Sequence, residues 1–363
     1  MVWMGIVMMM LYVAGNGYIF WRLWQLLQTA PMAVRIGFTI LFWGISLLFF
    51  VAMAMRNSEH CPLLTKAMMW LGTTWMVFIL YMVLATALFD LLGLFIPALH
   101  HGVVYALGIT TLLLVYGNIN YRNPKVEHLD IALDKSIASE DVRMVVVSDV
   151  HLGYGTDRRA LERYVELINA QHPDVVVIVG DLIDNSITPV RGECMGEVLD
   201  RIEAREGIYV VPGNHEYISG IEASEAFIRD TRLVLLRDSV VTLHSGIQLV
   251  GRDDRFNRRR APLGELLRGV DMSHPVVVLD HQPYDIAKSD KLGVDIHLSG
   301  HTHHGQIWPL SLITEAMYDQ SHGYRHWSHT HAYVSSGLSL WGPPFRIGTH
   351  SDLAVIDLHR AEQ

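Results

Sequence analysis

Long apolar segments fill the first third of the 363-residue chain. Four windows of about 20 residues, the length that crosses a bilayer as a helix, contain no Lys, Arg, Asp or Glu. They are Val2–Trp21, Ile36–Met55, Ala67–Phe89 and Gly102–Tyr121. Aromatic residues typical of the membrane interface lie near their ends. The pattern predicts a transmembrane region of four helices over residues 1–121.

The flanking charges give an expectation for the orientation of these helices. No Lys or Arg precedes the first window, so we expect a retained span rather than a cleaved signal peptide. With four spans, both ends of the region lie on one side, which carries Arg56, Lys66, Arg122 and Lys125, against Arg22 and Arg35 on the other. The excess of positive charge favours a cytoplasmic position for the rest of the chain.

A different pattern follows Tyr121. Residues 122–141 mix charges, Pro and Ser and are predicted to be a linker with room for one short strand. From residue 142 onward, short valine-rich runs alternate with amphipathic segments such as Asp157–Gln171. The predicted strands include Val142–Val150, Val175–Val179, Ile208–Val211, Val276–Leu279 and Ile296–Leu298. This alternation predicts a layered α/β domain over residues 142–363.

Composition and charge exclude several classes of protein. Half of the residues are hydrophobic and 18% are charged, which excludes a disordered chain. Two distant cysteines exclude a disulfide scaffold, and without a CxxC motif they argue against thiolate zinc sites. Residues 1–120 carry a net charge of +2 and the remainder −11, and 17 of the 20 histidines follow Tyr121. The acidic, histidine-rich second part does not fit a nucleic-acid binder and suits a site for cations.

Five polar motifs each follow a predicted strand. They are Asp149-Val150-His151, Gly180-Asp181, Gly213-Asn214-His215-Glu216, Asp280-His281 and Gly300-His301-Thr302-His303. Each motif alone is more often a turn, a helix start or a chance histidine tract. Five in succession at strand ends predict one site, because ligands of α/β sheets bind at the carboxyl ends of strands. Oxygen and imidazole ligands without sulfur suit Mn, Fe, Zn or Co, singly or paired.

The order of these motifs resembles that of the calcineurin-like metallophosphoesterase superfamily, over roughly Arg143 to His359. The segments 300–306 and 341–348 resemble its YkuE/YaeI-like branch, and the multi-span front end resembles the transmembrane proteins that carry this domain. The branch commonly has Gly where this chain has His304. This departure concerns the residues around the metal ligands and not the expected ligands themselves. The resemblance implies a four-layer α/β/β/α sandwich behind the four-helix transmembrane region.

The resemblance also implies a site with two divalent metal ions, Mn, Fe, Zn or Co, that activate a water. One metal is expected on Asp149, His151 and His303 and the other on Asn214, His281 and His301, with Asp181 bridging both. His215 is expected to polarise the phosphate or to protonate the leaving group. Glu216 is expected to support the site or to start a helix rather than to bind metal.

An arginine-rich segment lies just ahead of the Val276 strand. Arg252, Arg255 and Arg258 are candidate substrate-binding residues, because arginine forks bind phosphate and lipid headgroups. A solvated loop, paired with the acidic residues nearby, explains the segment equally well. The histidine-rich segment Tyr318–His331 could line a pocket, but we favour a surface loop.

The combined expectation is a multi-pass protein of a bacterial inner membrane with a cytoplasmic phosphoesterase domain. It would hydrolyse a phosphodiester or pyrophosphate bond of a phosphorylated substrate beside the bilayer, with no nucleic-acid partner. A lipid-linked substrate such as a UDP-diacylglucosamine-like glycolipid precursor is a candidate by resemblance, although dedicated lipid A enzymes commonly carry Arg after the motif Asn. The alternative is a membrane sensor or scaffold that binds metal and turns over little. A transporter is disfavoured, because the spans carry almost no polar groups.

Overall fold

The chain forms two compact units. The computed structural model describes residues 2–135, 137 and 141–361; the others, including 136 and 138–140 of the expected linker, lie outside that description. One unit comprises Met1–Ile119 with Gly342–Phe345, and the other comprises Asn120–Trp341 with Arg346–Gln363.

The first unit is built from four long apolar helices: α1 (Val2–Leu26), α2 (Met32–Met55), α3 (Pro62–Gly93) and α4 (Gly102–Tyr121). A single 3₁₀ turn, η1 (Pro97–Leu99), precedes α4. Ile19, Phe42, Met82 and Val103 share one apolar cluster, so each helix contributes to the packing. Many other apolar side chains of these helices face outward. All four helices are long and apolar enough to cross a membrane, which confirms the number of predicted spans.

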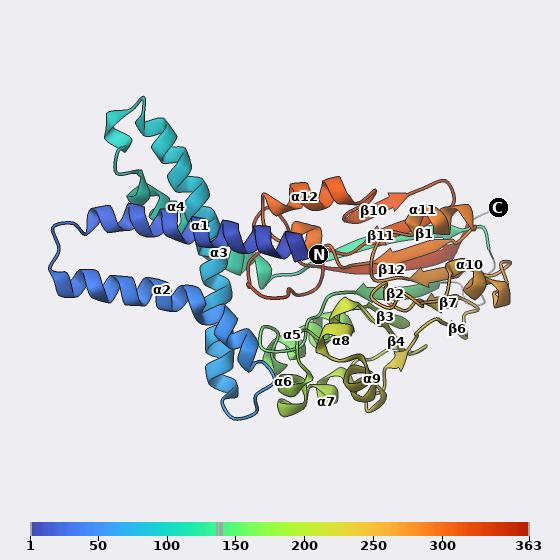
Figure 1. The fold of residues 1–363 in the computed structure, drawn as a ribbon. Helices are drawn as coiled ribbons and strands as arrows, with labels where there is room; N and C mark the ends of the chain where they lie inside the picture. The colour runs from blue at the N-terminus through green and yellow to red at the C-terminus, as the bar shows by residue number, and fades with distance from the viewer. Residues whose placement is uncertain (1, 136, 138–140, 362–363) are drawn as a thin grey trace. The chain divides into compact units, whose positions relative to one another are not determined.

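The second unit contains two six-stranded sheets (Figure 1). The first has the order β1 (Lys125–Leu133), β12 (Asp352–Arg360), β2 (Asp141–Val147), β3 (Val175–Val179), β4 (Ile208–Val211) and β5 (Val234–Leu235). The second has the order β10 (Gly323–His326), β11 (His331–Val334), β9 (Ile296–Ser299), β8 (Val276–Leu279), β7 (Gln248–Gly251) and β6 (Ser239–Thr242). The strands β2, β3, β4 and β5 run parallel to one another, and so do β7, β8, β9 and β11. The pairs β12–β2, β6–β7 and β10–β11 are antiparallel.

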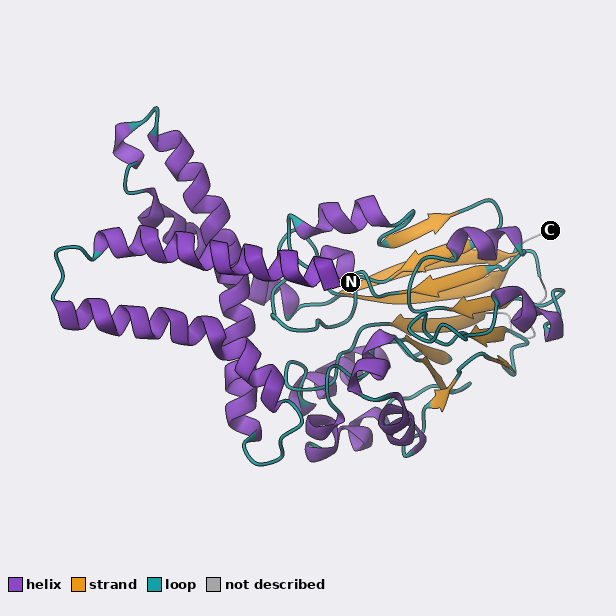
Figure 2. Cartoon of the chain, in the orientation of Figure 1, coloured by secondary structure: helices purple, strands orange, loops and turns teal. Residues whose placement is uncertain are grey.

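Helices cover the outer faces of both sheets (Figure 2). The inner faces share one core, to which the first sheet contributes Val146 and Val177 and the second contributes Leu279 and Leu298. Four helices pack on the outer face of the first sheet: α5 (Arg158–Asn169), α6 (Ile187–Gly192), α7 (Met195–Leu199) and α9 (Ile221–Arg229). The outer face of the second sheet meets α10 (Leu263–Leu266), the 3₁₀ turn η2 (Leu267–Gly269) and α11 (Ile286–Lys291). The fold is therefore the expected four-layer α/β/β/α sandwich.

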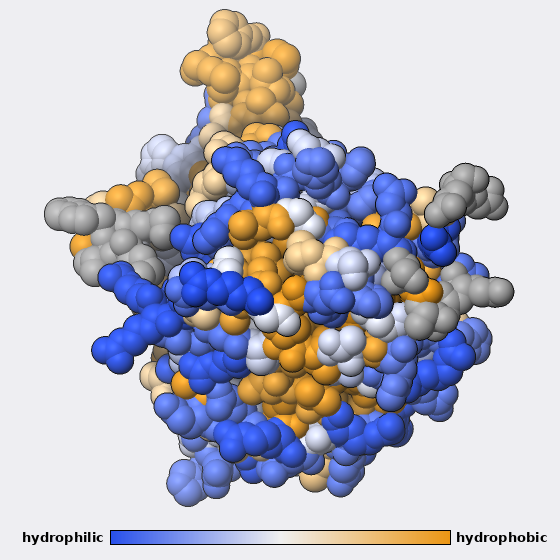
Figure 3. All heavy atoms as spheres, turned by 90° about the vertical axis from the view of Figure 1, so that its right-hand side faces the viewer, coloured by the Kyte–Doolittle hydropathy of each residue, from blue (hydrophilic) through white to orange (hydrophobic). Residues whose placement is uncertain are grey.

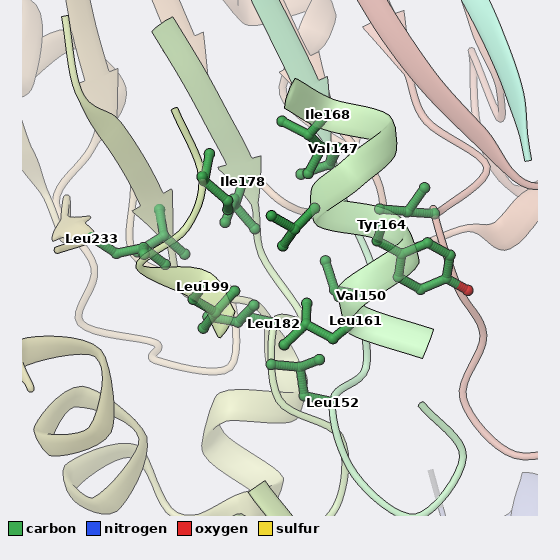
Figure 4. Close-up of a cluster of buried hydrophobic side chains, with 14 of the residues drawn as sticks. Val147, Val150, Leu152, Leu161, Tyr164, Ile168, Ile178, Leu182, Leu199 and Leu233 are labelled. Atoms are coloured by element: carbon green, nitrogen blue, oxygen red, sulfur yellow. The ribbon is translucent and has the colours of Figure 1, made fainter. Parts of the chain in front are cut away.

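The amphipathic helix α5 shows how the outer layers form. Asp157 caps its first turn by accepting a hydrogen bond from the Ala160 amide. Its apolar residues Leu161, Tyr164 and Ile168 then pack against Val147 and Ile178 of the sheet (Figure 4). The face on the right-hand side of Figure 1 is largely hydrophilic around its rim, with apolar side chains exposed in its middle (Figure 3).

The segment expected as a linker contains a regular strand. β1 pairs along its whole length with β12, from Lys125 to Leu133, so it belongs to the first sheet. Its side chains alternate between exposed and buried only near its end, which is typical of an edge strand. Only residues 122–124 separate α4 from this strand.

Candidate metal centre

The candidate site lies where the parallel strands of both sheets end. The loops after β2, β3 and β4 come from the first sheet, and those after β8 and β9 come from the second. Acidic and imidazole side chains from these loops meet within the sandwich. Three groups have ligand atoms within 4.8 Å of one another: Asp149, His151 and His303; His151, Asp181 and His215; and Asp181, His281 and His301. The shared members make these groups one cluster.

The atoms that face one another are those that bind cations. The Nε2 atoms of His151 and His303 lie 3.1 Å apart, and His303 Nε2 lies 3.3 Å from Asp149 Oδ1. On the other side, His281 Nε2 lies 3.0 Å from Asp181 Oδ2. The nitrogens of His151 and His303 thus face each other at 3.1 Å, near the buried carboxylates of Asp149 and Asp181. This arrangement suits a positive ion bound between the side chains.

The backbone is strained where this cluster forms. Asp149, His151, Asp181, His301 and His303 all have positive φ, between 49° and 70°. Residues other than glycine rarely adopt this left-handed conformation, and such residues concentrate at functional sites. The strained turns aim successive side chains into one small volume.

Two motif glycines leave room for the carboxylates. A Cβ atom on Gly300 would collide with Ser148 and with the carboxylate of Asp149. A Cβ atom on Gly213 would collide with the carboxylate of Asp181. Glycine is therefore required at these positions by the close approach of the loops.

Hydrogen bonds from backbone amides and from the Ser148 hydroxyl fix the two carboxylates. The Asp149 carboxylate accepts hydrogen bonds from Ser148 Oγ at 2.6 Å and from the His301 amide at 3.0 Å. Asp181 Oδ1 accepts one from the His215 amide at 2.8 Å. These donors hold each carboxylate in place, so that little reorganisation is needed when a cation binds.

Glu216 supports the turns instead of entering the cluster. It lies in α8 (Asn214–Ser219), and its carboxylate accepts hydrogen bonds from the amides of Gly213, Asp181 and Ile183. Burial and the nearby Asp181 raise the pKa of Glu216 to about 7, although these amides act in the opposite direction. It thus joins the Gly180-Asp181 turn to the start of α8.

Asp184 is a site residue that the motif analysis did not include. Its Oδ1 lies 3.1 Å from Nδ1 of His215 and 3.5 Å from Nδ1 of His151. Burial would lower the pKa of His215, but Asp181 and Asp184 outweigh it and raise that pKa. Burial alone would raise the pKa of Asp184, yet the two imidazoles bring it to about 2. The sequence held one signal for this role: Asp184 lies three residues after Asp181, in the loop that follows β3.

Arg346 is a second residue that the sequence left unassigned. It is fully buried, and its Nη1 donates to the His303 carbonyl at 2.6 Å. Its Nη2 donates to the carbonyls of Ser336 and Gly337, which belong to the loop after β11. Burial lowers the pKa of Arg346 to about 10. The guanidinium thus fixes the backbone that presents His303.

Asn214 and His301 have the properties of neutral ligands. Asn214 is the first residue of α8 and precedes His215. Among the described residues, its buried Oδ1 has no hydrogen-bond partner. Burial, reinforced by His281, lowers the pKa of His301 to about 4, which keeps its imidazole neutral. An unsatisfied buried oxygen and a neutral imidazole both fit a divalent cation.

His304, the departure from the branch pattern, does not join the three groups. It belongs to the 3₁₀ turn η3 (His303–Gly305), and its Nε2 lies 3.1 Å from Glu315 Oε1. Its ring stacks on that of His322, with centroids 3.4 Å apart. The ring is therefore engaged outside the cluster.

The three arginine candidates have different environments. Arg252 is buried, and its Nη1 lies 2.7 Å from Asp280 Oδ2 and 2.5 Å from Asp285 Oδ2. This corrects the expectation that Arg252 is available to a substrate, because its charge neutralises two carboxylates of the fold. Arg255 and Arg258 are exposed.

The histidine-rich segment is a surface feature. Tyr324 and His326 of β10 are exposed, and so are His322 and His329 in the adjoining loops. The rings of His326 and His331 stack with centroids 4.2 Å apart. Their exposure agrees with the expected surface position, but the expectation of a loop is wrong for Gly323–His326, which forms the edge strand β10 paired with β11.

Residues 142–305, which include all five motifs, match the calcineurin-like phosphoesterase family. A Helicobacter pylori metallophosphoesterase is 36% identical over 241 residues, covering 65% of this chain and 64% of the relative. A Campylobacter jejuni metallophosphoesterase is 31% identical over 258 residues, covering 69% and 68%. The Bacillus subtilis metallophosphoesterase YkuE, 26% identical over 263 residues, supports the resemblance to that branch.

A membrane relative is also similar. The zebrafish (Danio rerio) "transmembrane protein with metallophosphoesterase domain" is 34% identical over 276 residues, covering 71% of this chain and 63% of the relative. The chain thus spans slightly less than two thirds of the length of the Helicobacter and zebrafish relatives. The name of the zebrafish protein combines a membrane part and a metallophosphoesterase domain.

Proposed function

Because the chain belongs to the calcineurin-like phosphoesterase family, we propose that it is a membrane-bound, metal-dependent phosphoesterase that cleaves a phosphodiester or pyrophosphate bond. The observation that carries the proposal is the convergence of imidazoles and carboxylates from both sheets on one buried cluster. Four membrane-capable helices in the same chain make it a membrane protein.

The donor set fits two divalent metal ions. Asp149, His151 and His303 would hold one, and Asn214, His281 and His301 would hold the other, with Asp181 between them. The support is that Asp181 shares groups with both His151 and His281, and that the unsatisfied Asn214 oxygen is buried. Such ions would supply Lewis acidity for the phosphoryl group and lower the pKa of the attacking water.

His215 has the position of a proton donor for the leaving group. Its Nδ1 lies 3.1 Å from Asp184 Oδ1, so the opposite nitrogen, Nε2, is the ring atom that would face a substrate. Burial would lower the pKa of His215, but its acidic neighbours outweigh burial and raise it, which favours the protonated ring that a proton donor needs. The ring lies next to the exposed Trp341, with centroids 6.3 Å apart. His215 would therefore transfer its proton at the exposed edge of the cluster.

The membrane unit suggests where the substrate resides. A phosphorylated lipid, such as a UDP-diacylglucosamine-like glycolipid precursor, would remain beside an enzyme held in the same bilayer. The membrane would be a bacterial inner membrane, and the charge bias around the spans supports a cytoplasmic position for the domain. Arg255 and Arg258, both exposed, are the remaining candidates for contact with the anionic substrate.

The test compares two chromogenic esters with the detergent-purified chain. Bis-p-nitrophenyl phosphate and p-nitrophenyl phosphate would be offered with and without Mn²⁺, beside the Asp181→Asn variant. We expect metal-dependent cleavage of the diester by the wild type and its loss in a folded variant. Near-normal turnover by Asp181→Asn would contradict the proposal. Bound metal without turnover of either ester would instead favour the sensor or scaffold.

A further inference from the structure

An exposed apolar helix is the next α-helix after the Gly300-His301-Thr302-His303 motif. α12 (Leu310–Met317) begins five residues after the end of η3. Leu312, Ile313 and Met317 on this helix, and Trp308 just before it, are 50–59% exposed. Glu315 is the only charged residue of the helix, and it is paired with a histidine. A soluble surface rarely leaves such a group of large apolar side chains in water.

Aromatic contacts extend this surface from the end of α12. The ring of Tyr318, which ends the helix, lies 4.9 Å from that of Tyr284, and their hydroxyl groups are 3.2 Å apart. The guanidinium of Arg255 lies 4.2 Å from the centre of the Tyr284 ring. Next in sequence, the exposed Phe256 stacks on Tyr217 at 5.3 Å.

These contacts connect the two halves of the candidate metal centre. One end of the series follows the loop that carries His301 and His303, and the other end reaches α8, which carries Asn214 and His215. We call the side chains of Trp308, Leu312, Ile313, Met317, Tyr318, Tyr284, Arg255 and Phe256 the docking rim. The docking rim thus adjoins the site from both sheets.

The chemistry of the docking rim matches the interfacial layer of a bilayer. Aliphatic side chains enter the boundary of the acyl chains, Trp and Tyr reside at headgroup level, and Arg attracts anionic lipid. The tether favours a bilayer over a soluble partner. α4 ends at Tyr121 and β1 begins at Lys125, so the connection reaches about 14 Å at most. A domain tethered this closely to a spanning helix remains at the membrane surface.

We propose that the docking rim inserts into the headgroup layer, so that the adjoining site takes phosphoesters carried by membrane lipids. This inference rests on the proposed phosphoesterase function for its substrate class. The insertion itself is independent of turnover, and the two parts are tested separately.

The first test measures where Ile313 lies. The full chain is prepared with Cys61→Ser and Cys194→Ser, which removes both exposed thiols, and with Ile313→Cys carrying an environment-sensitive fluorophore. It is reconstituted in phosphatidylcholine vesicles with and without phosphatidylglycerol. Val234→Cys is the matched control, because Val234 is apolar, 45% exposed and located on β5 at the edge of the other sheet.

We expect lipid-borne doxyl groups to quench the label at position 313, while aqueous iodide quenches it little. The label at position 234 is expected to show the opposite response. Equal access of iodide to both labels would overturn the proposal. Protection of position 313 from both quenchers would also overturn it, because protein rather than lipid would then cover the helix.

The second test separates lipid from soluble substrates. In the same vesicles, Leu312→Glu combined with Ile313→Glu is compared with Val234→Glu and the wild type. The probes are a dialkylglycerol p-nitrophenyl phosphodiester in the bilayer and soluble bis-p-nitrophenyl phosphate. The double variant is expected to lose about tenfold in kcat/KM for the lipid ester alone, since two aliphatic side chains no longer insert.

An equal loss on both esters, or no loss on the lipid ester, would overturn the assigned substrate class. If the wild type cleaves neither ester while position 313 still responds to doxyl lipid, the proposed enzymatic function fails and the docking of the rim stands.

Discussion

Asp149 and Asp280 occupy corresponding places in the two sheets and have opposite surroundings. Each follows a buried, valine-rich strand, β2 or β8. Asp149 faces imidazoles and backbone donors, with His303 Nε2 at 3.3 Å. Asp280 faces two guanidinium groups, with Arg252 Nη1 at 2.7 Å and Arg260 Nη1 at 2.9 Å.

The difference shows that the partners of a strand-end carboxylate decide its role. The charge of Asp280 is neutralised within the fold, so this residue holds loops together. The charge of Asp149 is balanced by groups that a cation can share, so it remains available for binding. A buried carboxylate needs one of these arrangements, since leaving it unpaired is costly.

The largest expected effect comes from removing the available charge. Asp149→Asn keeps the size of the side chain and an acceptor oxygen for the His301 amide. We expect hydrolysis of bis-p-nitrophenyl phosphate to fall about a thousandfold, as the loss of several kcal/mol of electrostatic stabilisation implies. Steady-state kinetics and metal content would be measured beside Asp280→Asn, which is expected to keep its metal. Retention of turnover by Asp149→Asn would remove the distinction between the two carboxylates.

The next effect is on stability. Arg252→Met leaves Asp280 and Asp285 with less neutralising charge in a buried site. We expect the free energy of unfolding of the domain to fall by about 3 kcal/mol. Thermal melting in detergent would measure it, with Arg258→Met as the control from the same segment, since Arg258 is exposed. Equal melting temperatures for the two variants would show that Arg252 is not a structural partner of Asp280.

A smaller effect is expected from the carboxylate behind His215. Asp184→Asn should lower kcat/KM by about 10–100-fold, as loss of an orienting partner usually does. Asp184 helps to raise the pKa of His215. Removing it lowers that pKa, and a proton donor then loses its proton at lower pH. The alkaline limb of the pH–kcat/KM profile should therefore move to lower pH; an unmoved limb would argue against His215 as the acid.

The smallest effect concerns His297, which lies on β9 and belongs to none of the five motifs. Burial lowers the pKa of its ring to about 4, and the ring contacts Ser289 Oγ at 2.6 Å and Ser299 Oγ at 3.1 Å. Between the unfolded pKa of about 6.5 and this folded value, the unfolded chain binds the extra proton. Stability should fall by about 1 kcal/mol per pH unit as the pH drops through that window. His297→Gln should lack this contribution, and parallel pH dependence of wild type and variant would contradict it.

The sequence predicted the elements whose signal is local. Charge-free windows identified all four apolar helices, and valine runs identified the central strands, because parallel strands are apolar on both faces. The exposed strand β10 carries Tyr324, Arg325 and His326, so it lacks an apolar alternation. β1 was not identified as a full strand, because most of its residues lie at the sheet edge.

Partners distant in the sequence could not be predicted in the same way. The motifs identified the residues that meet in the cluster, since each follows a strand end. Arg252 looked available because nothing in the sequence shows that it faces Asp280, 28 residues away. Arg346 gave no signal for the same reason, as it contacts His303 across 43 residues.

The most direct measurement of the central claim is a titration of the metal-free chain with Mn²⁺, followed by electron paramagnetic resonance. The account predicts two Mn²⁺ per chain and the spectrum of an exchange-coupled pair, because Asp181 lies between both ligand groups. In Asp181→Asn the coupled signal should disappear. A wild-type chain that binds a single uncoupled Mn²⁺, or none, would contradict the account.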